Sequence, residues 1–267
     1  MLLYNYLNTS KVHKHKPIQI PKIIHMCNKI LDAKSIEYSQ NWKKLNPDFT
    51  IRLSDENMKK TFLQTEFPKI YADIFDFLED GPIKADFWRI CVLYKHGGVY
   101  SDIDIEPLIP LSQFIEPNIG FVTCSAYREY LAFNPSFIIA PKECIIIKNA
   151  IDWYIKKYES KEPYHYWAWS IMQAFTDTLL LNRYNNREGI YIYKGDNKQE
   201  LKVQIIQEVP GKEHSDAHNL YKGMRVFNNR YKDWDHVSHR FILDENVENV
   251  ENVENGENGE NGDTTRQ

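Results

Sequence analysis

The 267-residue sequence lacks the long apolar segments that would place it in a membrane. A helix that spans a bilayer needs about 18 or more consecutive apolar residues, and no such run occurs. The first 16 residues are polar and rich in Lys and His, without the apolar stretch of a signal peptide. We therefore expect no membrane span and a soluble, cytoplasmic protein.

Cysteine is scarce, and its placement excludes two common small-domain classes. The four residues are far apart, and none forms a CxxC pair: Cys27, Cys91, Cys124 and Cys144. This spacing excludes a zinc ribbon and a dense disulfide framework, so we expect reduced, mostly buried thiols. A Walker-type Gly-Lys-Ser/Thr sequence and an HExxH sequence are also missing, which weakens two other common enzyme interpretations.

Charge of one sign is concentrated at the C-terminus. The formal net charge is -4, but residues 244–267 carry eight acidic groups and one Arg, which leaves 29 acidic against 32 basic residues elsewhere. So small an excess does not indicate a nucleic-acid-binding protein. The repetitive acidic tract has nothing to bury, so we predict a disordered tail at 244–267, a flexible leader at 1–16 and one domain at 17–243.

The rest of the chain has the composition of a folded domain, with 42% hydrophobic residues. Apolar periodicity predicts strands at 17–25, 49–53, 120–124, 136–141, 190–195 and 202–209, and helices at 35–46, 55–62, 68–78, 144–158 and 170–181. In the helix at 35–46 we expect Ile36, Trp42 and Leu45 to share a side. The alternation of strands and helices predicts a single-domain α/β fold.

Residues 81–107 form the most informative segment. Gly81-Pro82 opens a predicted helix, and Gly97-Gly98 ends it, because glycine adopts left-handed backbone angles easily. The following VYSDIDI alternates with period two, which predicts a strand with Tyr100, Asp102 and Asp104 on one side.

Two carboxylates two residues apart on a strand can lean toward one cation. Asp102 and Asp104 would lie about 6.6 Å apart and suit Mg or Mn, which prefer hard oxygen ligands. For an isolated Asp-x-Asp, the more common explanation is a solvated strand face. Here the pair follows a helix and a Gly-Gly turn at a strand end, where ligands bind in open α/β sheets.

Asp86 and Arg89 lie three residues apart on the predicted helix, so their side chains can be neighbours. One explanation is a surface ion pair of little energetic value. The other is that Asp86 accepts hydrogen bonds from a hydroxylated ligand and Arg89 offers its planar fork to hydroxyl or phosphate groups. Spacing alone does not separate the two explanations.

An aromatic cluster follows the predicted helix at 144–158, with the sequence YHYWAW at residues 164–169. Such rings can stack on sugars, although core packing is their more common role.

Together these segments resemble a known family. The sequences IPKIIH, NWKKLNPDFTIRLSDE and KADFWRICVLYKHGGVYSDIDIEPL are similar to those of glycosyltransferase family 32, the DXD-containing sugar transferases that include initiating α-mannosyltransferases and the glucosylating-toxin catalytic core. The family pattern is matched at many fixed positions: Asp86, Arg89, Leu93, Tyr94, Gly97, Gly98, Tyr100, Asp102 and Asp104.

The resemblance implies a GT-A fold, a Rossmann-like mixed sheet flanked by helices, and a Mn2+- or Mg2+-dependent enzyme. This enzyme would move a hexose from a UDP- or GDP-sugar to a glycan, protein or other hydroxyl acceptor, with retention of configuration. It further implies that Asp102 and Asp104 hold the metal, with Asp102 also near the donor ribose. Asp86 and Arg89 would meet the sugar hydroxyls, and Tyr100 would lie beside the diphosphate.

The sequence departs from the family near its C-terminus, where DWDHVSHRF only partly matches the His…Ser-Trp element. Candidates for a third metal ligand are Asp235, His236 and Ser238. Two further functions stay open: a carbohydrate- or nucleotide-binding module without turnover, and a metal-dependent phosphohydrolase, because paired carboxylates also serve phosphoryl chemistry.

Overall fold

The computed structural model describes residues 18–126, 132–179, 187–195, 200–211 and 217–229, all within one compact unit. The predicted leader at 1–16, the tail at 244–267 and the three candidate third ligands lie outside the described residues. Within the described part of the chain, no helix combines the length and apolar character that crossing a membrane requires.

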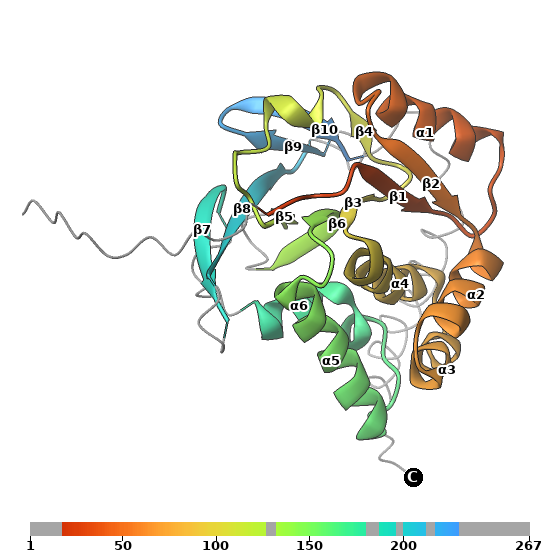
Figure 1. Ribbon diagram of the computed structural model, residues 1–267. Coiled ribbons are helices and arrows are strands. Elements are labelled where there is room, and N and C mark those ends of the chain that lie inside the picture. Colours follow the sequence, from red (N-terminus) through yellow and green to blue (C-terminus); the bar gives the residue numbers. More distant parts are fainter. Residues whose placement is uncertain (1–17, 127–131, 180–186, 196–199, 212–216, 230–267) are drawn as a thin grey trace, which may run out of the picture. The chain divides into compact units, whose positions relative to one another are not determined.

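The described residues form a mixed sheet with helices packed against it (Figure 1). The strands are β1 (Ile23–Cys27), β2 (Thr50–Ser54), β3 (Gly98–Ser101), β4 (Glu106–Pro107), β5 (Phe121–Ser125), β6 (Phe133–Ala140), β7 (Gly189–Lys194), β8 (Glu200–Val209), β9 (His218–Tyr221) and β10 (Met224–Asn228). The helices are α1 (Ala33–Leu45), α2 (Glu56–Glu66), α3 (Lys69–Phe77), α4 (Gly81–His96), α5 (Ile145–Glu159) and α6 (Ile171–Thr178), with short 3-10 turns at Leu111–Gln113 and Trp167–Trp169. This arrangement confirms the expected α/β fold, with a mixed sheet flanked by helices.

The strand order is β2-β1-β3-β6-β5-β8-β9-β10-β4, with β7 paired to β8. β1 is parallel to β2 and β3, β6 is antiparallel to β3 and β5, and β5 is parallel to β8. The carboxyl ends of β1, β2, β3, β5 and β8 therefore meet at one edge of the sheet. In open α/β sheets this edge is where ligands bind.

The sheet curls, because a short link joins β3, inside the strand order, to β4 at one end of it. Five strand positions lie between β3 and β4 in the strand order, so in a flat sheet the two strands would be about 29 Å apart. Five residue steps join Ser101 to Glu106, and these span at most about 18 Å. Phe137 on β6 and Phe227 on β10 accordingly touch, with ring centroids 4.6 Å apart.

Trp42 of α1 packs against the inside of this curl. Its ring lies 5.8 Å from Phe137 and 5.7 Å from Phe227, and its Nε1 donates to the Ile105 carbonyl. The buried face of α1 is Ser35, Tyr38, Ser39 and Trp42. The expectation that Ile36 shares the side of Trp42 was wrong: Ile36 is 52% exposed. Six residues separate the two, which is less than two full helical turns.

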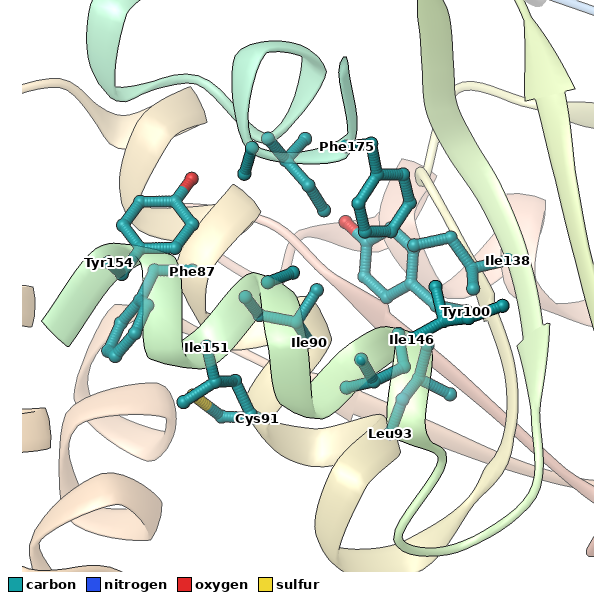
Figure 2. Close-up of a cluster of buried hydrophobic side chains, with 14 of the residues drawn as sticks. Phe87, Ile90, Cys91, Leu93, Tyr100, Ile138, Ile146, Ile151, Tyr154 and Phe175 are labelled. Atoms are coloured by element: carbon teal, nitrogen blue, oxygen red, sulfur yellow. The ribbon is translucent and has the colours of Figure 1, made fainter. Parts of the chain in front are cut away.

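Helices α4 and α6 pack on the opposite face of the sheet, and α5 packs against both of them (Figure 1). Figure 2 shows how side chains from these helices meet Tyr100 of β3 and Ile138 of β6. Ile138 follows Phe137 directly, and successive strand residues point to opposite faces, so β6 contributes to both layers. All four cysteines are free and buried, which confirms the expected thiols.

Two glycines set the junction between α4 and β3. Gly97 has φ +64, and a Cβ there would lie 2.5 Å from the Lys142 nitrogen. Gly98 has φ +105, and a Cβ there would lie 2.6 Å from the Ile23 carbonyl oxygen. Both the backbone angles and the close approach require glycine, as predicted. The junction fixes how the residues of α4 stand relative to the end of β3.

Candidate active site

The site begins with a buried ion pair on α4. Asp86 and Arg89 are 8% and 6% exposed, and Oδ1 of Asp86 lies 2.9 Å from Nη2 of Arg89. The two residues are one helical turn apart, and α4 packs between the sheet and α5, which keeps water from both. This burial excludes the surface ion pair that the spacing left open.

Arg89 joins this pair to the end of β3. Its Nη2 lies 3.1 Å from Oδ1 of Asp102, and its guanidinium carbon lies 4.5 Å from the centre of the Tyr100 ring. The Tyr100 hydroxyl donates to the same Asp102 oxygen at 2.7 Å. We call Asp86, Arg89, Tyr100 and Asp102 the arginine cluster. Four of the five residues that the sequence singled out therefore meet at one point.

Backbone groups from two other elements complete the cluster. Nη1 of Arg89 donates to the Pro135 carbonyl of β6 at 2.7 Å. Oδ2 of Asp86 accepts from the Ile171 N–H, the first residue of α6, at 3.0 Å. A helix N-terminus stabilises negative charge, so α6 supports the Asp86 carboxylate. The sequence did not reveal these two contacts, because a backbone group leaves no residue signature.

The strand predicted for VYSDIDI is shorter than expected. β3 ends at Ser101, and the chain turns, with the Ile105 N–H donating to the Asp102 carbonyl. The prediction that both aspartates stand on a strand was therefore wrong. Their partial exposure still alternates with the buried Ile103 and Ile105, and the Asp102 N–H donates to the Ser136 carbonyl at 2.8 Å. The two aspartates thus follow the carboxyl end of β3.

Burial and neighbouring charge oppose one another at this site. Burial raises the pKa of Asp86 to about 6, although Arg89 and the Ile171 N–H favour its charged form. Burial also raises the pKa of Asp102 against the effect of Arg89 and the Tyr100 hydroxyl. For Arg89, burial lowers the pKa, but the carboxylates of Asp102 and Asp86 outweigh it, so the guanidinium stays charged.

The donor chemistry at this edge fits a hard divalent cation. Asp86 and Asp102 flank the Arg89 guanidinium, and Asp104 adds a third carboxylate two residues after Asp102. Asp102 and Asp104 are partly exposed and offer carboxylate oxygens, the ligands that Mg and Mn prefer. Among the described residues, no group of three or more His, Cys, Asp or Glu side chains forms a complete metal site.

The two tryptophans of the aromatic segment after α5 differ in burial. Trp169 is fully buried, its Nε1 donates to the Pro163 carbonyl, and its ring lies 4.9 Å from that of Phe77. Trp167 is 56% exposed and packs edge-on against Tyr166. Trp169 is therefore part of the core, and Trp167 is the exposed ring of the aromatic segment at residues 164–169.

Comparison with known proteins identifies the class of this region. Residues 32–121 match the family described as the glycosyltransferase sugar-binding region containing a DXD motif. The matched segment includes α4, β3, Asp86, Arg89, Asp102 and Asp104. The match over this region confirms the resemblance inferred from the sequence.

The relatives are sugar transferases by name. The chain is 32% identical over 154 residues to mannosyl phosphorylinositol ceramide synthase CSH1 of Saccharomyces cerevisiae, covering 55% of this chain and 40% of that protein. It is 25% identical over 170 residues to the initiation-specific alpha-1,6-mannosyltransferase of Schizosaccharomyces pombe, covering 59% and 40%. The chain thus spans about two fifths of the length of these relatives. Among solved structures, PaToxG glycosyltransferase is similar with a TM-score of 0.47 and 24% identity, over 60% of this chain and 68% of that one.

Proposed function

We propose that this protein is a metal-dependent glycosyltransferase that moves a hexose from a UDP- or GDP-sugar to a hydroxyl acceptor, with retention of configuration. The observation that carries the proposal is the buried arginine cluster at the carboxyl end of β3, inside the segment that matches the DXD family. The names of the two yeast relatives favour mannose as the transferred sugar, and a sugar or inositol-type hydroxyl as its acceptor.

Charge development defines what such a site must do. As the glycosidic bond breaks, the nucleoside diphosphate gains negative charge and the sugar becomes oxocarbenium-like. A divalent cation, held by Asp102 and Asp104, would supply electrostatic stabilisation of the leaving diphosphate. Candidates for a further ligand are Asp235, His236 and Ser238.

The remaining contribution of the chain is positioning. We assign Asp86 and Arg89 to the sugar hydroxyls, and Arg89 also holds the Asp86 and Asp102 carboxylates at fixed places. Tyr100 fixes Asp102 through its hydroxyl, and we assign it a place beside the diphosphate. Groups held in this way lose little freedom when the donor binds, which favours the reaction. We assign the whole activity to a domain at residues 17–243.

The test is release of nucleoside diphosphate from GDP-mannose and a panel of UDP-sugars with Mn2+. We compare the unmodified protein with Asp104→Asn, which keeps the side-chain size but removes the charge. Turnover should fall about 100-fold or more, because the variant lacks one carboxylate that would hold the divalent cation. That cation would stabilise the negative charge on the leaving diphosphate. The matched control is Asp73→Asn, at an exposed ion pair with Lys69 on α3, which should leave turnover unchanged.

Equal activity of the Asp104→Asn variant and the unmodified protein would contradict the proposal. Donor binding without any turnover would instead support a binding module. Release of inorganic phosphate without an acceptor would support a phosphohydrolase.

A further inference from the structure

A second polar group lies at the same sheet edge as the arginine cluster. We call Asn134, Glu208, Asn219 and Asn229 the amide cluster. Asn134 is near the start of β6, Glu208 is near the end of β8, and Asn219 is on β9 directly opposite Glu208. Asn229 follows the last residue of β10. The antiparallel pairing of β9 with β8 and β10 brings all four residues to the carboxyl edge of β8.

The carboxylate at the centre of the cluster is held by two amides. Glu208 is 6% exposed, and its Oε1 accepts from Nδ2 of Asn134 at 3.1 Å and from Nδ2 of Asn229. A buried carboxylate is stable only when its oxygens are hydrogen-bonded, so these contacts explain why Glu208 can be buried. They also fix which way both amides point, with each carbonyl oxygen turned away from the carboxylate.

The amide behind them has no partner among the described residues. Asn219 is 1% exposed, and both its Oδ1 and its Nδ2 are buried without a hydrogen bond in that part of the chain. Oδ1 of Asn229 is also buried without a hydrogen bond to the described residues. A buried polar atom without a partner costs about 1–3 kcal/mol, so folding gives no reason for an amide at position 219.

The unpartnered atoms define the chemistry of what they could bind. They comprise a donor, Nδ2 of Asn219, and two acceptors, Oδ1 of Asn219 and Oδ1 of Asn229. A hydroxyl group both donates and accepts, and so matches this set. A bare cation would face the N–H groups of Asn219, and a phosphate would meet the Glu208 carboxylate without a positive side chain in the cluster. The set therefore favours sugar or polyol hydroxyls.

The amide cluster lies near the proposed transfer site. Asn134 is two residues before Ser136, whose carbonyl accepts the Asp102 N–H. Burial raises the pKa of the Cys124 thiol, and the Glu208 and Asp102 carboxylates raise it further. This thiol therefore interacts electrostatically with a carboxylate of each cluster. Asn134 and Asn229 are half-buried, whereas Asn219 is 1% exposed.

We propose that the amide cluster is a hydroxyl-binding subsite for one of the two sugars, with Asn219 as its specificity-determining residue. The proposal rests on the proposed glycosyl transfer. The hydroxyl belongs either to the transferred sugar of the donor or to the acceptor, and the chemistry required of the cluster is the same in both cases.

The experiment compares the unmodified protein with Asn219→Leu, which is close in size and lacks both polar atoms. Binding of GDP, GDP-mannose and methyl α-mannoside is measured by calorimetry with Mn2+. We expect GDP affinity to be unchanged, and the affinity for either GDP-mannose or methyl α-mannoside to fall at least tenfold. Loss for GDP-mannose assigns the subsite to the donor sugar, and loss for methyl α-mannoside assigns it to the acceptor.

Thermal unfolding separates this role from a structural one. Asn219→Leu and Asn219→Ala lose no hydrogen bond to the described residues, so at least one of them should unfold at the same temperature as the unmodified protein or higher. The matched control Asn149→Leu removes the bond from Asn149 to the Tyr193 hydroxyl, so it should lower the unfolding temperature without changing sugar binding.

Unchanged affinity for both sugar ligands in Asn219→Leu would overturn the subsite, as would failure of both Asn219 variants to fold. Failure of the unmodified protein to bind either GDP or UDP would instead contradict the proposed transferase, and this result does not depend on the sugar ligands.

Discussion

The arginine cluster and the amide cluster share one sheet edge but differ in how their polar atoms are satisfied. In the arginine cluster a guanidinium, a tyrosine hydroxyl and a helix N-terminus are matched to two carboxylates, and a backbone carbonyl accepts from the guanidinium. In the amide cluster the carboxylate is matched, but the adjacent Asn219 is not. Matched charges keep a site in one geometry before a ligand arrives. An unmatched amide instead reduces stability and gains its partner only from a ligand.

Arg89→Met, in the arginine cluster, should cause the largest loss in the free energy of unfolding. It leaves the buried Asp86 and the partly buried Asp102 without their common cation, and removing one partner of a buried pair costs about 3–5 kcal/mol. Urea unfolding should show this loss in the free energy of unfolding. Arg52→Met, at an exposed position on β2, is the control and should stay within about 0.5 kcal/mol. A loss below about 1 kcal/mol for Arg89→Met would mean that the pair does not organise the site.

The second prediction concerns the pH dependence that Asp86 introduces. Its folded pKa is raised to about 6 from 3.8, so between these values the folded state retains a proton that the unfolded state has released. This group therefore favours folding at low pH, and its contribution is lost as pH rises toward 6. The difference amounts to about 3 kcal/mol, at about 1.4 kcal/mol per pKa unit.

The measurement is urea unfolding of the unmodified protein and Asp86→Asn in metal-free buffer at pH 4 to 7. The stability of the unmodified protein relative to Asp86→Asn should fall between pH 4 and 6 and then level off. Asp102 and Arg89 face Asp86 in both proteins, so their titration largely cancels in the difference. A difference that is independent of pH would show that Asp86 titrates normally.

Glu208→Leu should have a smaller effect, because it acts on neutral partners. It removes the acceptor of the Asn134 and Asn229 amides, and half-buried amides regain part of their hydrogen bonding from water. We expect a loss of about 2 kcal/mol in the free energy of unfolding. Glu200→Leu, 60% exposed at the start of the same strand, is the matched control and should change little. Equal effects of the two substitutions would mean that the amide cluster contributes nothing to stability.

The sequence was sufficient for the parts of the site that depend on local spacing. Asp86 and Arg89 are one helical turn apart, and Gly97-Gly98 marks the junction, so α4 and its link to β3 could be predicted. The end of β3 could not, because the turn after Ser101 depends on the curl of a sheet whose distant strands are set by tertiary pairing.

The amide cluster left an ambiguous signal. In KVQIIQEV, Gln204 and Glu208 lie on one face of a strand, which by periodicity indicates solvent, yet both are buried. Their burial follows from β9 and β10, two short strands that were not predicted. The backbone contacts of Asp86 and Arg89 could not be predicted either. Any residue type at position 135 has a carbonyl, and almost any at position 171 has an N–H, so the sequence carries no signal for these contacts.

The short link from Ser101 to Glu106 has a mechanical consequence. It joins β3, at the centre of the sheet, to β4, which pairs only with β10 among the described strands. If β10 separates from β9, the strain passes through four residues to Asp102. We therefore expect the β9–β10 hairpin and the aspartate turn to open as one cooperative unit in amide hydrogen exchange. A ligand bound at either end would slow exchange at the other.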